Sequence, residues 1–206
     1  TAPLTRRVPA VIVLACHARD IGGESGMSLR GRGDARPGKK LNEEKLYTYG
    51  LRALTRQPRS TFQLKKALEK RAEEPRFVSR VIAQLKGLGY LDDRRFASEF
   101  ASYRSRVKHY GKFRVTRELR SKGLSDEYVE KAIAEVFGDQ DEGEAVRERI
   151  ARKLRNVRRP YDGKTIRRLY QALLRAGYSS DIIGREVYKL SKINVEDLKL
   201  EGEASE

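Results

Sequence analysis

The chain has very little cysteine and histidine, and this shortage excludes several classes of protein. Cys16 is the single cysteine in 206 residues, so no internal disulfide framework is possible, and we expect a cytoplasmic location. The two histidines, His17 and His109, stand far apart without neighbouring ligands, which gives no support for a metal site. No nucleophile–base pairing is visible either. We therefore expect no enzyme activity, no metal and no other cofactor.

Long hydrophobic runs are also missing. The apolar run from Val8 to Cys16 contains Pro9 and is far too short to span a bilayer. It loosely imitates a signal peptide, but no clear small-residue cleavage site follows, and Arg19 and Asp20 come soon after. We expect no contact with a membrane.

Strand-like alternation is nearly absent, and one helical pattern occurs three times instead. Leu68, Leu119 and Leu173 hold the same position in this pattern, separated by 51 and 54 residues. The other members of the ladder are Leu64, Val78, Ile82 and Leu85 in the first copy, Val115, Val129, Ile133 and Val136 in the second, and Leu169, Ile183, Val187 and Leu190 in the third. A fixed period with constant internal spacing is typical of repeat proteins. The sequence predicts an all-α fold: an elongated, curved array of three tandem three-helix repeats.

The boundaries of the repeats follow from glycine, proline and charge. Glycines and Pro37 interrupt residues 1–40, which we expect to be a disordered basic leader in which Met27 is the natural start. The three repeats then cover residues 41–91, 92–138 and 139–191. Residues 192–206 carry five acidic residues against two lysines and are expected to form an acidic, flexible tail.

Local signals place helices within these repeats. An apolar stripe predicts a first helix over residues 43–54. Ser60 followed by Gln63 predicts a capping box at the start of the next helix, and Pro75 fits the first turn of the third. Phe96, Phe100, Tyr103 and Val107, at helical spacing, predict the buried stripe of the second repeat's first helix.

The chain has a large excess of positive charge. Its net charge is +16 and its pI is about 10.1, which favours a polyanion or an acidic protein surface as the partner. The excess is concentrated in two segments: eight lysines or arginines against one acid from Arg104 to Lys122, and eleven against two from Arg147 to Arg175. Because arginine can bind two oxygens of a phosphate or carboxylate at once, these segments are candidate binding surfaces.

Several short motifs carry a family resemblance. Leu-Asp-Asp-x-x-Phe-Ala stands at residues 91–97, Tyr110 precedes Gly111, and Glu118-Leu119-x-x-Lys122-Gly123 follows. In this order and spacing the chain resembles the RecX family of regulatory proteins over about residues 43–191. The residues that we expect to have structural roles are Leu91, Asp92, Asp93, Phe96, Ala97, Tyr110, Gly111, Leu119 and Gly123.

The resemblance implies a regulator without catalytic activity. Family members lie in the helical groove of the filament that the RecA recombinase forms on single-stranded DNA. They modulate, mostly inhibit, ATP hydrolysis, filament growth and strand exchange in DNA repair and the SOS response. The partners implied are the RecA filament and single-stranded DNA, with duplex DNA as a further option, and we expect a monomer.

Helical geometry, at about 100° per residue, places many of the basic side chains opposite the apolar ladder. Arg114, Arg117 and Arg120 oppose Val115 and Leu119 on one helix. The full set of candidate contacts to RecA or DNA is Arg104, Arg106, Lys108, Lys112, Arg114, Arg117, Arg120, Lys122, Arg149, Arg152, Arg155, Arg158, Arg159, Lys164, Arg168 and Arg175. Any single arginine of this set could simply belong to a solvent-exposed helix face. The sequence does not indicate which of these residues contact RecA and which contact DNA.

Other functions fit the sequence less well. A sequence-independent DNA-binding protein or a helix-turn-helix transcription regulator is the main alternative, but the second repeat's third helix carries four acids against Lys131 alone and would be repelled by a major groove. Asp92 and Asp93 could suggest a metal-dependent nuclease, yet at a helix start they more readily cap free amides. Gly163-Lys164-Thr165 imitates the end of a phosphate-binding loop, but Arg158 stands where that motif needs glycine.

Overall fold

The computed structural model describes residues 40–190, and this part of the chain is built from helices. The helices are α2 (Glu43–Arg56), α3 (Thr61–Glu69), α4 (Pro75–Gly87), α5 (Asp93–Arg106), α6 (Lys112–Ser121), α7 (Asp126–Phe137), α8 (Glu142–Leu154), α9 (Gly163–Ala176) and a last helix over residues 180–190. A single parallel bridge, Leu41 to Ala72, is the only β-type pairing within residues 40–190. The predicted all-α class, with three helices to a repeat, is confirmed.

Some predictions fall on other parts of the chain or remain untested. The acidic tail and all of the basic leader except Lys40 lie outside the described residues. The exact repeat boundaries, and the elongated, curved arrangement, stay predictions. No helix within residues 40–190 is long and apolar enough to cross a lipid bilayer.

The described chain divides into two compact units. The first contains the residues up to Phe96 together with Lys122–Leu124, and the second contains Ala97–Ser121 and the residues from Ser125 onward. Each unit has its own hydrophobic core.

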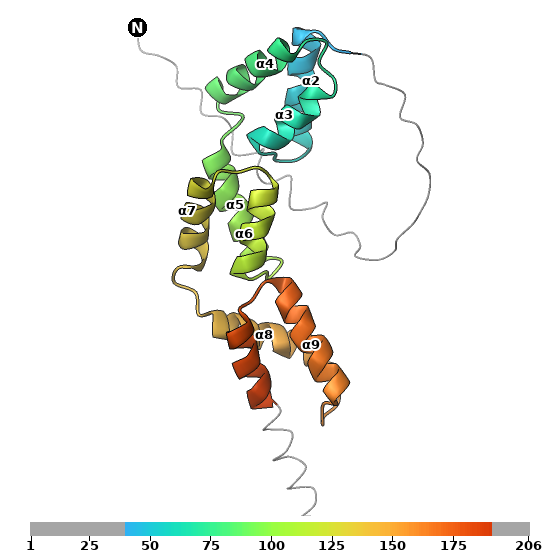
Figure 1. Cartoon of the computed structure of the whole chain (residues 1–206), viewed down its shortest axis with the longest axis vertical. Helices are drawn as coiled ribbons and strands as arrows, with labels where there is room; N and C mark the ends of the chain where they lie inside the picture. The colour runs from blue at the N-terminus through green and yellow to red at the C-terminus, as the bar shows by residue number, and fades with distance from the viewer. Residues whose placement is uncertain (1–39, 191–206) are drawn as a thin grey trace, which may run out of the picture. The chain divides into compact units, whose positions relative to one another are not determined.

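Helices α2, α3 and α4 pack against one another in the first unit (Figure 1). Leu46, Leu64, Leu68, Val81 and Leu85 are fully buried between them. A Cβ atom at Gly50 would lie 3.2 Å from Cδ1 of Leu85, so the glycine lets α2 pack closely against α4.

The predicted helix starts of the first unit are confirmed. The side chains of Ser60 and Gln63 form the capping box of α3, and Pro75 occupies the first turn of α4. Helix α2 begins at Glu43, as predicted, and continues two residues beyond Leu54.

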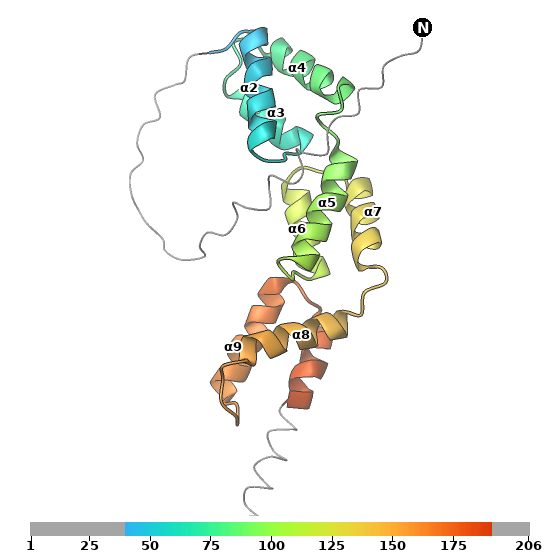
Figure 2. The same cartoon turned by 180° about the vertical axis from the view of Figure 1, so that it is seen from behind.

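The second unit contains most of α5, all of α6 to α9 and the last helix (Figure 2). Val115, Leu119 and Val129 form the buried side of α6 and α7, while Val146, Leu173 and Ile183 lie in the core shared by α8, α9 and the last helix. These are members of the predicted ladder, and most of that ladder is buried in both units.

One detail of the α5 prediction is wrong. Ala97 and Ala101 form its fully buried stripe, whereas Phe100 and Tyr103 are half-buried and Val107 is 53% exposed. Small side chains let α5 approach its neighbours closely, and the larger aromatic rings lie at the margin of that contact beside arginine and lysine side chains.

A similar junction at a helix start occurs once in each unit. In the first unit, the Ser60 hydroxyl at the start of α3 donates to the Lys122 carbonyl, with 2.5 Å between the oxygens. In the second, the backbone N–H of Gly111 at the start of α6 donates to the Ala176 carbonyl at 2.8 Å. Ser60 and Gly111 are 51 residues apart, and Lys122 and Ala176 are 54 apart, so the junction repeats with the period of the leucine ladder.

Glycine makes both junctions possible. Gly123 and Gly177 follow α6 and α9 with φ values of +74° and +89°, which side-chain-bearing residues rarely adopt. A Cβ at Gly123 would lie 2.6 Å from Cβ of Phe62. In the second unit, the carbonyl-rich end of α9 next to the start of α6 also pairs the negative end of one helix dipole with the positive end of another.

Candidate functional site

The basic side chains of the second unit do not all face solvent, and a first group of them forms an internal cluster. Arg104 of α5 and Arg114 of α6 both contact the carboxylate of Glu118, at 3.0 and 2.9 Å. The Arg114 guanidinium lies 3.7 Å from the centre of the Tyr110 ring and also donates to the Arg175 carbonyl. Arg114 therefore joins α6 to the end of α9 through its charge, and its predicted contact with RecA or DNA stays a prediction.

Arg149 of α8 is a second inward-facing arginine. It is half-buried and donates to the carbonyl oxygens of Lys108 and His109, at 3.1 and 2.7 Å. The Tyr178 hydroxyl donates to the same His109 carbonyl at 2.9 Å. Arg149, which the sequence predicts as a contact to RecA or DNA, therefore already binds two carbonyl oxygens of the turn after α5.

These contacts fix the turn at His109, which has a φ of +51°. Burial lowers the pKa of the His109 imidazole from its usual 6.5, and the positive charges of Arg152 and Arg149 lower it further against the opposing effect of Glu148. Burial also raises the pKa of the Tyr178 phenol above its usual 10.0. At neutral pH both side chains are therefore uncharged, and the turn has no negative side chain to repel an anion.

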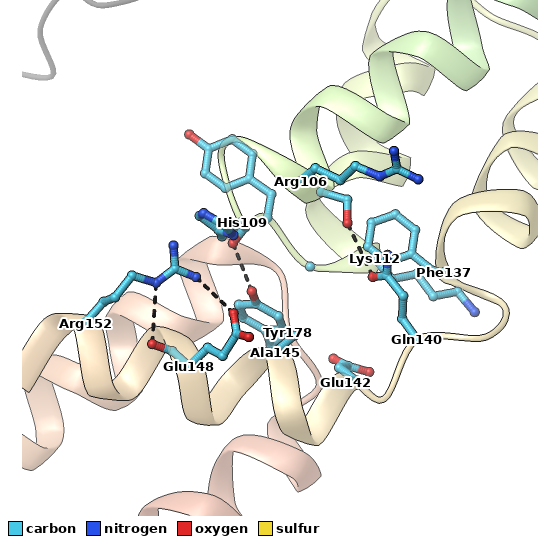
Figure 3. Close-up of a pocket in the computed structure, with 13 residues that line it drawn as sticks. Arg106, His109, Lys112, Phe137, Gln140, Glu142, Ala145, Glu148, Arg152 and Tyr178 are labelled. Atoms are coloured by element: carbon cyan, nitrogen blue, oxygen red, sulfur yellow. Dashed lines mark hydrogen bonds and ion pairs between the residues drawn. The ribbon is translucent and has the colours of Figure 1, made fainter.

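A pocket of about 400 Å³ opens beside this turn (Figure 3). Arg106, Lys112 and Arg152 contribute cations to its lining, and aromatic rings come from Tyr110, Phe137 and Tyr178.

The two acidic side chains in the lining are already engaged. The Glu142 carboxylate accepts from the Ser179 backbone N–H at 2.6 Å, and Glu148 pairs with Arg152 at 3.4 Å. Arg106 and Lys112 are exposed and make no ion pair with any described residue. The pocket thus offers cationic and aromatic groups without a free carboxylate, and this arrangement suits a phosphate group or an acidic side chain.

The exposed side of α6 carries a smaller basic surface. Arg117 is exposed and has no hydrogen-bond or ionic partner among residues 40–190. Arg120 is exposed too, but pairs with Asp126 at 2.8 Å. Exposed pairs of this kind are weak, so Arg120 can exchange partners more readily than Arg114.

The remaining predicted cations are distributed over several elements. Arg155 and Arg159 line a second pocket of about 390 Å³ next to α8 and the last helix. Lys108 lies 5.8 Å from the Tyr103 ring, and Lys122 is grouped with the first unit. The others are exposed: Arg158, Lys164, Arg168 and Arg175. Arg106, Lys112 and Arg152 share one pocket and Arg155 and Arg159 share another, so the predicted set does not form a single site.

The residues expected to be structural have clear contacts. Leu91, Ala97 and Leu119 are buried. The Asp92 carboxylate accepts from the Arg95 backbone N–H at 2.9 Å, and Asp93 accepts from the Thr61 N–H at 2.8 Å. Both aspartates therefore cap helices, as expected, and no group of three His, Cys, Asp or Glu side chains within residues 40–190 could hold a metal.

Gly163-Lys164-Thr165 also has an ordinary structural role. It begins α9, where Asp162 accepts from the Thr165 N–H at 2.8 Å.

The sequence interpretation overlooked Phe113. Its side chain is 61% exposed on the first turn of α6, between Lys112 and Arg114. Tyr103, Tyr110 and Tyr170, which also lie near basic residues in the sequence, are all half-buried. The exposure of Phe113 was predictable from the sequence. The helical geometry that places the arginines opposite Val115 and Leu119 also places Phe113 there.

Comparisons with known proteins agree on one family. The model described as "RecX, second three-helix domain" matches residues 92–133. Regulatory protein RecX of Streptomyces coelicolor is 33% identical over 147 residues, which are 71% of this chain and 78% of the relative. Regulatory protein RecX of Thermobifida fusca is 30% identical over 173 residues, covering 82% of this chain and 89% of the relative. The crystal structure of RecX from Lactobacillus salivarius has the same fold, with a TM-score of 0.58 at 22% identity over 72% of this chain and 96% of that one.

Proposed function

Because the chain belongs to the RecX family of regulatory proteins, we propose that it regulates the RecA recombinase by binding the filament that RecA forms on single-stranded DNA. The action is physical obstruction in the cytoplasm, with no chemical step. The proposal also includes the helical groove of the filament as the place of binding, and inhibition of ATP hydrolysis, filament growth and strand exchange as the main effect.

The pocket between the end of α5 and the start of α8 is the observation that carries this proposal. Arg106 and Lys112 are exposed there without acidic partners, and both acids of the lining are occupied by other contacts. Together with a net charge of +16, this favours a partner with regularly spaced anionic groups. A nucleoprotein filament offers such groups on its DNA backbone and on acidic side chains.

Binding alone does not explain inhibition. A filament must change its arrangement during hydrolysis and strand exchange, and a bound protein shifts that equilibrium only by its different affinity for the two arrangements. We propose that the chain prefers an arrangement in which neighbouring RecA subunits do not advance.

Capture experiments test the proposal directly. The chain should bind RecA assembled on single-stranded DNA more tightly than free RecA or free DNA at the same salt concentration. Equal retention on bare DNA would instead favour the alternative, a sequence-independent DNA-binding protein.

A charge-reversal variant identifies the surface. Replacing Arg106, Lys112 and Arg117 together by Glu should abolish filament binding and inhibition of the RecA ATPase. The matched control replaces Arg52, Arg56 and Lys86 of the first unit, which are also exposed, by Glu. The net charge changes equally in both variants, so an equal loss in both would show that overall charge, and not this surface, determines binding.

A helix-turn-helix regulator remains the less favoured function. Asp126, Glu127 and Glu130 are exposed on α7, the helix that would have to enter the major groove, and a negative helix is repelled there. Footprinting on duplex DNA should show no preferred sequence.

A further inference from the structure

The exposed side of α6 carries an aromatic ring that the core does not use. Phe113 is 61% exposed, whereas Val115 and Leu119 on the opposite side of the helix are fully buried. The backbone N–H of Phe113 donates to the Gly177 carbonyl at 3.1 Å. The main chain that holds the ring is therefore fixed, although the ring itself faces solvent.

One cation lies beside this ring on the helix surface, and another precedes it in the sequence. Lys112 immediately precedes it, and Arg117 follows it by four residues, which places Arg117 next to Phe113 on the surface of the helix. Both cations are exposed, and neither side-chain charge has a hydrogen-bond or ionic partner among residues 40–190.

The first repeat contains the same pattern of an aromatic residue followed by a cation, and there the two side chains contact each other. Phe62 stands 51 residues before Phe113, at the start of α3, and Lys66 follows it by four residues. The Lys66 ammonium lies 4.3 Å from the centre of the Phe62 ring, and this ring also packs beside Gly123. No cation of the described residues lies over the Phe113 ring in this way, so its face remains available.

We propose that Phe113 is a stacking platform for one unpaired base of single-stranded DNA, with Lys112 and Arg117 binding the phosphates on either side. The inference rests on the proposed function and names the DNA contact within it. A planar ring among cations matches a nucleotide, because every base has an aromatic face and every link carries a negative charge. An apolar protein partner is less well matched, since Lys112 and Arg117 near Phe113 are charged.

Fluorescence tests the stacking itself. The chain contains no tryptophan, so Phe113→Trp introduces a single reporter at the platform. Adding an oligothymidylate of about 40 nucleotides should strongly quench its emission, because the indole stacks on a base. Leu88→Trp is the matched control: Leu88 is 49% exposed in the first unit, and its reporter should respond little. If the oligonucleotide binds, as followed by anisotropy, while the emission at position 113 stays unchanged, the proposal is overturned.

A series of substitutions at Phe113 distinguishes stacking on a base from general hydrophobic contact. Phe113→Tyr should keep the affinity for the oligonucleotide, whereas Phe113→Leu and Phe113→Ala should each lower it about tenfold. Circular dichroism should be the same for all three, because the side chain is not part of the core. Full affinity in the Leu variant would overturn the proposal.

The outcomes also distinguish this inference from the proposed function. If the Leu and Ala variants bind filaments poorly but bind free single-stranded DNA normally, the ring contacts protein and the stacking proposal is overturned. If the unmodified chain shows no preference for filaments over bare DNA, the proposed function fails, while quenching at position 113 would still support base stacking.

Discussion

At the scale of single residues, Gly111 determines how closely the start of α6 can approach the end of α9. A Cβ atom at this position would overlap the carbonyl oxygen of Gly177 and lie 2.7 Å from the backbone nitrogen of Tyr178. These are backbone atoms, which cannot rotate away as a flexible side chain can. The hydrogen bond from Gly111 to Ala176 exists only because the position has no side chain.

Gly111→Ala should therefore destabilise the second unit. Relief of the overlap requires the two helix ends to separate, and we expect a loss of about 2–3 kcal/mol in the free energy of unfolding. Guanidinium chloride titration followed by circular dichroism measures it. Gly163→Ala is the control, because nothing lies within 4 Å of its added Cβ; equal stability of the two variants would contradict the role given to Gly111.

His109 gives the second unit a stability that depends on pH. Its pKa is lowered from 6.5, first by burial and then by Arg152 and Arg149, while Glu148 acts in the opposite direction. A lowered pKa means that this contribution to stability is complete above pH 6.5 and is lost as the pH falls through the folded-state pKa.

The free energy of unfolding should accordingly decrease between about pH 7.5 and about pH 5.5. His109→Asn should show a smaller decrease over the same interval, because Asn cannot titrate and tolerates a φ of +51°. Denaturant titrations at several pH values provide the comparison, and parallel curves for the two proteins would rule out His109 as the cause.

At the scale of helices, the starts of α3 and α9 are stabilised to different degrees. Ser60 is fully buried, accepts from the Gln63 N–H and donates to the Lys122 carbonyl, so one hydroxyl caps α3 and joins it to the segment after α6. Asp162 accepts from the Thr165 N–H at an exposed helix start.

Ser60→Ala should thus lower the free energy of unfolding more than Asp162→Ala does. We expect a loss of about 2–3 kcal/mol for Ser60→Ala, since the half-buried Lys122 carbonyl also loses its donor, and of about 1 kcal/mol for Asp162→Ala, which loses only a cap. Thermal unfolding of the two variants measures both losses. If Ser60→Ala destabilises the protein no more than Asp162→Ala, the hydrogen bond from Ser60 to Lys122 does not contribute to stability.

At the scale of the whole molecule, positive charge is present on both units, but much of it is used internally. Arg104, Arg114 and Arg149 stabilise contacts within the second unit. Fewer of the predicted contact residues are therefore left for a partner than helical periodicity suggests. Binding should therefore depend on a limited number of phosphate contacts.

Salt dependence can count these contacts. For single-stranded DNA, the logarithm of the binding constant falls with the logarithm of salt concentration by about 0.7 for each phosphate neutralised. Arg117→Gln should reduce this slope by about 0.7, while Arg104→Gln should leave it nearly unchanged and instead lower stability, because Arg104 contacts Glu118. Fluorescence anisotropy over a salt series gives the slopes; equal slopes for Arg117→Gln and the unmodified chain would remove Arg117 from the interface.

The sequence by itself determined the helical class, the repeat and the start of several helices. These properties depend on local chemistry: the spacing of Leu64 and Leu68 along one helix face, the hydroxyl of Ser60 three residues before Gln63, and the fixed φ of Pro75. The motif around Asp92 and Asp93 also indicated helix capping correctly, although the amide that Asp93 caps, on Thr61, is 32 residues away in the sequence.

Only the tertiary structure decided which cations are available to a partner. Helical periodicity places Arg114 and Arg117 on the same outer arc, yet Arg114 contacts Glu118, Tyr110 and the end of α9, while Arg117 has no partner within residues 40–190. Arg149 likewise turns toward carbonyls 40 and 41 residues away. The physical reason is that a long charged side chain responds to the groups that packing brings within its reach, and the period of a single helix carries no information about those groups.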